Sequence, residues 1–132
     1  MFSFTSQPLA VPQLDPEVQF ARGKNLLSLE DFAGAEAAFR RALEVRPDFA
    51  EAHLFLGLAR YQADPHDDVA HEAIKHMTRA ADLDPKNDMA YYYLGQVYRR
   101  LGMADKAREM FQRAVELNLS NVLANRELKP GR

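Results

Sequence analysis

Chemically active side chains are concentrated in one short stretch of the sequence, YQADPHDD at residues 61–68. Its candidate groups are Asp64, His66, Asp67 and Asp68. Carboxylates and imidazoles bind divalent metal ions, and the same groups act as general acids and bases in catalysis. They also cap helices and keep turns solvated. The stretch is therefore open to three interpretations: a metal site, an acid/base site or a polar turn.

The rest of the sequence gives little support to enzymatic chemistry. Its four histidines are His53, His66, His71 and His76. No two of them have the spacing of three or four residues that places zinc ligands on one helix face. There is no cysteine, which excludes disulfides, thiolate catalysis and zinc sites built on cysteine. No serine lies in a nucleophile motif, and none of the six glycines belongs to a phosphate-binding loop. We therefore predict no enzymatic activity, no catalytic residue, no metal site and no cofactor.

Composition indicates the class of protein. The chain has 132 residues, of which 47% are hydrophobic and 27% charged, and this suits a single domain with a buried core. The net charge of −2 provides no basic field for holding phosphate backbones, so nucleic-acid binding is not expected. The N-terminal segment has no lysine or arginine, and no apolar run approaches the roughly 18 residues that a membrane span needs. We expect a cytoplasmic protein without membrane insertion.

Three segments of the chain repeat one another. Their corresponding small residues are Gly23, Gly57 and Gly95, followed by Ala35, Ala73 and Ala107. The glycines are 34 and 38 residues apart, whereas the alanines are 38 and 34 apart. The period is therefore 34, and four additional residues lie between the second glycine and the second alanine. This interval contains YQADPHDD.

Each repeat has the pattern of two amphipathic helices. Asp15 and the proline after it are typical of a helix start, and a second helix is expected over residues 32–45. Asp48 is placed to cap the first helix of the next repeat. Gly102 stands where a left-handed residue ends a helix, and Glu30 occupies the same place in the first repeat. The small residues are expected to let paired helices approach closely.

A 34-residue helix–turn–helix repeat with small residues at positions 8, 20 and 27 and proline at position 32 resembles the tetratricopeptide repeat. The resemblance implies an all-α, right-handed α-solenoid of three repeats with a short C-terminal capping helix. The expected division is an extended N-terminal segment at 1–15, repeats at 16–49, 50–87 and 88–121, and a capping helix and tail at 122–132. Arg22 and Leu119 depart from the family pattern, at positions where leucine and proline are usual.

The resemblance also assigns a place to YQADPHDD. Tyr61 lies at the end of the first helix of the second repeat and is expected to face a groove, and residues 63–68 are expected to lengthen the turn between helices. Asp67 or Asp68 is then expected to cap a second helix that begins near Val69. A polar turn is thus preferred to a metal site, and whether the additional residues act as a distinctive knob for partner recognition stays open.

In tetratricopeptide repeats the first helices line a concave groove that binds an extended peptide or a partner helix. The resemblance places ten residues of this chain in that groove: Phe20, Lys24, Leu27, Leu54, Leu58, Tyr61, Met89, Tyr92, Gln96 and Arg99. Five apolar members are expected to be exposed to the groove: Phe20, Leu54, Leu58, Tyr61 and Tyr92. Two further rings are expected to pack between repeats, those of Tyr91 and Tyr93.

One family function can be compared position by position. Family members that bind chaperone tails use lysine, asparagine and arginine at five positions. In this chain those positions hold Phe20, Lys24, Phe55, Met89 and Tyr93. Four of the five lack the required donors, so binding of a tail ending in EEVD is not expected.

The predicted function is a non-enzymatic adaptor that binds a protein or peptide with apolar anchors in its groove, in a bacterial regulatory or signalling complex. Two alternatives stay open: a secretion or assembly chaperone for an apolar client, and a self-associating scaffold that would form an oligomer. Residues 1–14 either pack on the solenoid as a competing ligand in its own groove or form a disordered lead-in. At the other end, Val122, Leu123 and Leu128 are expected to cover the apolar face of the third repeat.

Overall fold

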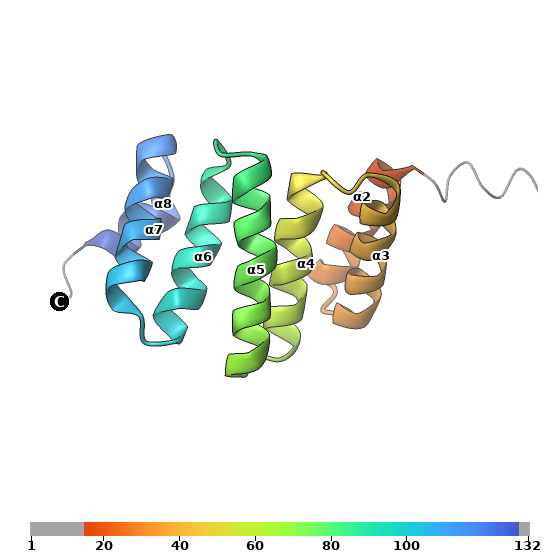
Figure 1. Ribbon diagram of the computed structural model, residues 1–132, viewed down its shortest axis with the longest axis horizontal. Coiled ribbons are helices and arrows are strands. Elements are labelled where there is room, and N and C mark those ends of the chain that lie inside the picture. The colour runs from red at the N-terminus through yellow and green to blue at the C-terminus, as the bar shows by residue number, and fades with distance from the viewer. Residues whose placement is uncertain (1–14, 130–132) are drawn as a thin grey trace, which may run out of the picture.

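Seven helices account for most of the described chain. The structure is a computed structural model that describes residues 15–129, and the predicted segment 1–14 and residues 130–132 lie outside this range. The helices are α2 (Pro16–Ser28), α3 (Phe32–Val45), α4 (Ala50–Ala63), α5 (Asp67–Leu83), α6 (Asp88–Arg100), α7 (Ala104–Leu117) and α8 (Val122–Leu128). They stand side by side in chain order, and the described range contains no β-strand (Figure 1). The predicted all-α solenoid is confirmed.

The helices pair into three hairpins. α2 packs on α3, α4 on α5 and α6 on α7, and successive hairpins meet where α3 packs on α4 and α5 on α6. The short α8 packs on α7, where a fourth hairpin would begin. Because each helix contacts mainly its neighbours, the core is divided into clusters along the row rather than gathered at one centre. Between residues 15 and 129, no helix is long and apolar enough to cross a membrane.

Polar caps and left-handed residues set several helix boundaries, and those at Asp15, Glu30 and Gly102 were predicted. The carboxylate of Asp15 accepts a hydrogen bond of 2.9 Å from the backbone at the start of α2, just before the proline in the first helical position. Asp31 and Asn87 cap α3 and α6 with their side chains. Glu30 and Gly102 have φ angles of 61° and 80°, so both occupy the left-handed region where the expected turns need it.

The cap predicted at Asp48 is wrong. The residue before α4 is Phe49, whose side chain makes no capping hydrogen bond. Its ring is buried instead, with its centroid 4.9 Å from that of Phe20 and with the Arg46 guanidinium 3.7 Å from its own centroid. The start of α4 is therefore determined by the burial of an aromatic ring between the first two hairpins, and the Asp48 carboxylate stays at the surface.

The four additional residues lengthen the helices of the second hairpin and leave its turn unchanged. In every hairpin three residues join the helices, at 29–31, 64–66 and 101–103. α4 has 14 residues where α2 and α6 have 13, and α5 has 17 where α3 and α7 have 14. The expectation of a longer turn is therefore wrong. The second hairpin extends beyond its neighbours at the turn end, as the lower end of α5 shows in Figure 1.

The predicted helix start near Val69 is wrong for the same reason. α5 begins at Asp67, and its N-cap position belongs to His66, which makes no capping bond through its side chain. Asp67 and Asp68 lie inside the first turn, where the positive end of the helix dipole stabilises their carboxylates. Pro65 holds the residue before it in extended backbone, which ends α4. The helical conformation resumes at Asp67, two residues after the proline.

Small residues let the paired helices touch, as predicted. A Cβ atom added to Gly23 would lie 2.5 Å from a ring carbon of Phe39, and one added to Gly95 would lie 2.5 Å from the matching ring carbon of Phe111. In the second hairpin, a Cβ atom added to Gly57 would lie 3.0 Å from a backbone oxygen of α5. The first and third hairpins therefore use the same contact between a glycine and a phenylalanine ring.

α8 covers the third hairpin with residues other than those predicted. Val122 and Leu123 are exposed, so the expectation that they cover the apolar face is wrong. Ala124 is fully buried against the third cluster, and Leu128 packs beside it. Residues four apart lie on the same face of a helix, and in α8 that face holds 124 and 128. The face of α8 that holds Ala124 and Leu128 therefore provides most of the cover for the third hairpin.

Candidate partner-binding groove

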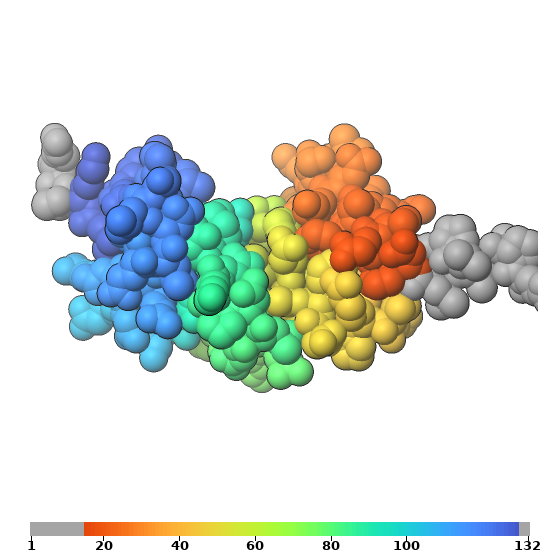
Figure 2. All heavy atoms as spheres, turned by 90° about the horizontal axis from the view of Figure 1, so that it is seen from above, coloured from red at the N-terminus to blue at the C-terminus, as the bar shows by residue number. Residues whose placement is uncertain are grey.

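The first helices of the hairpins line one side of the solenoid. Figure 2 views the molecule from above Figure 1 and shows this side hollowed between the N-terminal hairpin and the C-terminal helices. The floor of the hollow belongs to α4 and α6, and α2 closes one end. This is the surface on which the resemblance placed a partner-binding groove.

The ten predicted groove residues differ in exposure. Two are exposed, Lys24 and Arg99. Four are half-buried: Leu27, Tyr61, Met89 and Gln96. The remaining four are only 1% to 6% exposed: Phe20, Leu54, Leu58 and Tyr92. The expectation that these four face the groove as exposed anchors is wrong, and the accessible groove residues are the other six.

Phe20 is buried because other aromatic rings surround it. Its ring centroid lies 4.9 Å from that of Phe49, 5.6 Å from that of Phe55 and 5.8 Å from that of Phe39. These rings come from three successive helices and from the loop before α4. The four phenylalanines fill the junction between the first and second hairpins, so Phe20 stabilises this junction.

The other three buried residues are held by the later hairpins. Leu54 and Leu58 lie in one cluster with Leu94, across the junction between the second and third hairpins. The ring of Tyr92 packs 5.9 Å from that of Phe111. Its hydroxyl oxygen accepts a hydrogen bond of 2.7 Å from the side-chain amide of Gln96, which satisfies the buried hydroxyl. The half-buried Gln96 side chain therefore lies between the Tyr92 hydroxyl and the groove.

Cations lie on the first and last of the three groove helices. The Lys24 ammonium lies 4.9 Å from the ring centroid of Phe20, on α2. Arg99, on α6, forms an ion pair with Glu127 of α8, and its guanidinium lies 5.7 Å from the ring centroid of Phe111. Contacts between a cation and an aromatic ring contribute about 0.5–1 kcal/mol at exposed sites. The groove thus has apolar and amphipathic side chains in the middle, the Lys24 cation toward one end and the Arg99–Glu127 ion pair toward the other.

Tyr91 and Tyr93 pack between hairpins, as predicted. Both are half-buried and lie against the second and third clusters. Burial raises the pKa of the Tyr93 hydroxyl, and neighbouring Tyr92 raises it further. These two rings therefore help to hold α6 against its neighbours.

The chaperone-tail positions offer few donors. Phe20 and Phe55 pack against each other, and Met89 and Tyr93 are half-buried side chains without a charge. Lys24 is the one cation among the five. The set of donors that the family's chaperone-tail binders use is therefore not assembled in this groove.

The stretch YQADPHDD forms the tip of the long second hairpin. His66 and Asp64 interact through the Nδ1 atom and a carboxylate oxygen, and this hydrogen bond raises the pKa of the imidazole. The tip lies beside Arg100 at a shallow pocket. Within residues 15–129, no three histidine, aspartate or glutamate side chains are grouped so as to hold a metal ion. The described tip is a helix boundary with charged side chains at the surface.

Sequence reasoning missed an ion network between the first two hairpins. Arg60 of α4 donates hydrogen bonds of 3.1 Å to Glu36 of α3 and 2.6 Å to Glu72 of α5, and Arg40 donates one of 3.0 Å to Glu36. Burial alone would raise the pKa of Glu36, but the hydrogen bonds from Arg40 and Arg60 outweigh it and hold the pKa below its ordinary value. The sequence contains no local signal for this network, because its members are up to 24 residues apart in hydrogen-bonded pairs.

The chain matches two family models and several characterised proteins. Residues 20–68 match the family model described as Tetratricopeptide repeat, and residues 59–127 match the model described as Regulator of microtubule dynamics protein 1-3. Superkiller complex protein 3 from Mus musculus is 32% identical over 104 residues, which make up 77% of this chain and 7% of that protein. The chain thus spans a small part of this relative's length.

Solved structures agree in fold. The crystal structure of MamA is similar with a TM-score of 0.78 at 25% identity, over 95% of this chain and 70% of that one. The first tetratricopeptide repeat domain of Spaghetti (RPAP3), bound to the HSP90 peptide SRMEEVD, has a TM-score of 0.79 at 17% identity, over 88% and 89% of the two chains. The helical solenoid, its repeat and these matches lead to one conclusion: the chain belongs to the tetratricopeptide repeat family of protein-interaction modules.

Proposed function

We propose that the chain is a non-enzymatic adaptor that holds a segment of another protein in the groove lined by α2, α4 and α6. The observation that carries the proposal is the hollowed side of the solenoid (Figure 2). Its accessible side chains are apolar in the middle, with Lys24 toward one end and the Arg99–Glu127 ion pair toward the other. Leu27, Tyr61 and Met89 supply apolar contact area, and tyrosine and methionine are well suited to recognition because they are large and adaptable.

The groove chemistry indicates the kind of ligand. A segment with two or three apolar anchors would contact the middle of the groove, and a carboxylate near one of its ends would lie within reach of Lys24, since Arg99 at the other end is paired with Glu127. A structure with the same fold, that of Spaghetti, contains a bound peptide, which supports the use of such a surface for peptide binding. A cytoplasmic location and a bacterial regulatory or signalling complex stay part of the proposal, and the identity of the partner would test both.

Capture of partners by the immobilised full chain tests the groove. Tyr61→Ser removes an apolar contact from the groove, and Lys24→Glu reverses a charge there. Lys75→Glu is the matched control, because Lys75 is exposed on α5, outside the groove. We expect a protein that is retained by the wild type and by Lys75→Glu and is lost with Tyr61→Ser and Lys24→Glu. Equal capture by all four chains, with circular dichroism showing that all are folded, would contradict the proposal.

The captured proteins, together with light scattering, separate the two alternatives. An assembly chaperone would retain apolar clients that aggregate when the chain is withheld. A self-associating scaffold would show a mass above 15.0 kDa in light scattering that rises with concentration. An adaptor is expected to stay monomeric and to retain a specific partner.

A further inference from the structure

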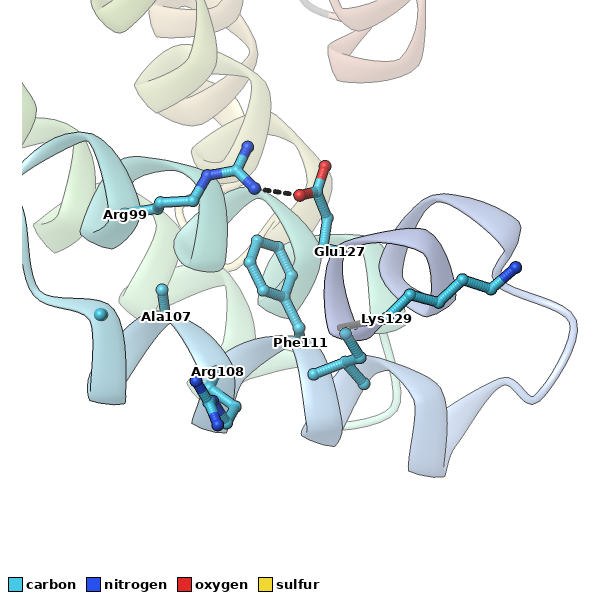
Figure 3. A pocket seen from close by; sticks show the side chains of 8 residues that line it. Arg99, Ala107, Arg108, Phe111, Glu127 and Lys129 are labelled. Atoms are coloured by element: carbon cyan, nitrogen blue, oxygen red, sulfur yellow. Dashed lines mark hydrogen bonds and ion pairs between the residues drawn. The ribbon is translucent and has the colours of Figure 1, made fainter. Parts of the chain in front are cut away.

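A pocket lies at the C-terminal end of the solenoid, beyond the end of α8. α8 has 7 residues, whereas α4, the helix that packs in the same way on α3, has 14. The surface of α7 that residues 15–129 leave uncovered forms a pocket of about 380 Å³ (Figure 3). Its walls include Ala104, Ala107, Arg108 and Phe111 of α7, Arg99 of α6 and Leu128 of α8. In Figure 3 the ring of Phe111 points toward the Arg99–Glu127 pair, and both residues of this pair line the pocket.

The first junction shows what such a surface contacts when it is covered. Ala35 and Phe39 of α3 correspond to Ala107 and Phe111 of α7, and there they pack with Leu56 and Ala59 of α4. Leu128 corresponds to Leu56, so α8 ends just before the helical turn that would supply a counterpart of Ala59. The pocket therefore lies where a second half of this helix would pack.

The pocket on α7 differs in charge from the corresponding surface of α3 in the first junction. There Glu36 of α3 pairs with Arg60 of α4 at 3.1 Å. In the second junction the corresponding residues are Ile74 and Tyr98, both half-buried beside one apolar cluster. At this position the first junction therefore pairs two opposite charges, and the second junction pairs two apolar side chains. On α7 the corresponding residue is Arg108, and between residues 15 and 129 it forms no ion pair.

A second copy of the chain fits this pocket poorly. In a head-to-tail stack, α2 of one copy would lie against α7 of the next. The position of α2 that corresponds to Leu56 and Leu128 holds Arg22, which is exposed. Stacking would bring this cation toward Arg108, and the two like charges would repel.

We propose that this pocket is a second docking site, which binds a short segment of a partner protein containing an apolar residue next to a carboxylate. The apolar side chain would cover Phe111 and Ala107, and the carboxylate would pair with Arg108. Lys129 also borders the pocket and adds positive charge, whereas Arg99 is already paired with Glu127. The site goes beyond the groove proposed above, because its floor belongs to α7 and the Arg99–Glu127 pair separates the two surfaces.

Two synthetic peptides derived from α4 provide the probe. The peptide LGLAEYQA copies residues 56–63 with the substitution R60E, and LGLARYQA is the unchanged sequence. Each is titrated into the isotope-labelled full chain while backbone amide shifts are recorded by NMR. We expect the glutamate peptide to shift amides of Ala104, Arg108 and Phe111 and to bind roughly fivefold more tightly than the arginine peptide, because one exposed ion pair contributes up to about 1 kcal/mol.

Two variants make the test specific to the pocket. Arg108→Glu is expected to reverse the preference between the peptides, whereas Arg126→Glu, an equal charge change at an exposed position of α8, is expected to keep it. Ala104→Tyr is expected to fill the pocket and abolish binding of both peptides, while capture through the groove is retained. Equal affinity for the two peptides, an unreversed preference in Arg108→Glu, or shifts confined to the groove would overturn the proposal. Concentration-dependent shifts of the same amides without peptide would also overturn it, in favour of a second copy.

Discussion

The first and last junctions of the solenoid are built on the same repeat position but are closed to different degrees. Phe39 and Phe111 correspond and are 0% and 3% exposed. Three further phenylalanine rings and a full-length α4 complete the first junction, together with the Arg60 network. The last junction has Tyr92, a two-turn helix and an open pocket. The comparison shows that the repeat sets where a core residue points, while the next helix determines how well it is covered.

The largest expected difference comes from truncating the two corresponding rings. Phe39→Ala should destabilise the chain by about 4–5 kcal/mol and Phe111→Ala by about 3 kcal/mol, because loss of a buried phenylalanine costs roughly 3–5 kcal/mol and the last junction is already partly open. Urea unfolding followed by circular dichroism measures both. An equal or larger loss for Phe111→Ala would show that the last junction is as tightly packed as the first.

The next largest difference in stability should come from removing Arg60 at the first junction and Arg99 at the last. Arg60→Met leaves Glu36 and Glu72 without their partner at a side chain that is 28% exposed, and we expect a loss of about 1–3 kcal/mol. Arg99 is 52% exposed, so Arg99→Met should cost less than about 1 kcal/mol. Arg79→Met, at an exposed position of α5, serves as the control. Urea unfolding at low and high salt tests the order, and high salt should reduce the exposed pair's contribution more.

Helix caps at the two ends offer a smaller contrast. Asn121 is buried, accepts a hydrogen bond of 2.9 Å from the backbone N–H of Ala124 and donates one of 2.7 Å to Asp88. Asn121→Ala should cost about 1–2 kcal/mol, at the upper end for a cap, because α8 is short and this residue also joins it to α6. Asp15→Ala at the exposed start of α2 should cost less. Hydrogen exchange would show faster exchange in α8 for Asn121→Ala, and unchanged exchange there would contradict this role.

The smallest expected effect concerns pH, and it should be confined to the second repeat, which contains all four histidines. Burial lowers the pKa of His76, so the unfolded chain binds a proton more readily than the folded chain. Stability should therefore fall as the pH drops from about 7 to about 5, below the ordinary histidine pKa near 6.5. The raised pKa of His66 acts in the opposite direction, giving stability below its ordinary pKa that is lost as the pH rises, but that side chain is exposed.

The variant His76→Gln tests this assignment. Its stability, measured by urea unfolding at several pH values, should fall less steeply between pH 7 and pH 5 than that of the wild type. His71→Gln, at an exposed position of the same helix, is the control for the substitution itself. An unchanged slope in His76→Gln would assign the acid response to other groups.

Local features of the fold could be predicted because a few neighbouring residues determine them. The cap at Asp15, the left-handed residues Glu30 and Gly102, and the bounds of α3 each depend on backbone preferences within one turn. The period of 34 and the interval containing the four additional residues follow from spacing alone. Close contact at Gly23 follows from the same period, because a repeated small residue indicates a repeated helix crossing.

Burial and closure were decided only by the tertiary structure. Phe20 and Leu54 stand at groove positions of the repeat, yet rings and leucines from other hairpins cover them. The additional residues beside Pro65 extend two helices because the backbone can resume the helical conformation directly after the turn, which composition did not reveal. The pocket on Phe111 exists because α8 ends early relative to α4. The repeat period and the helix caps are local properties of the chain. The exposure of a side chain depends on which residues distant in sequence pack against it, and only the folded structure determines that.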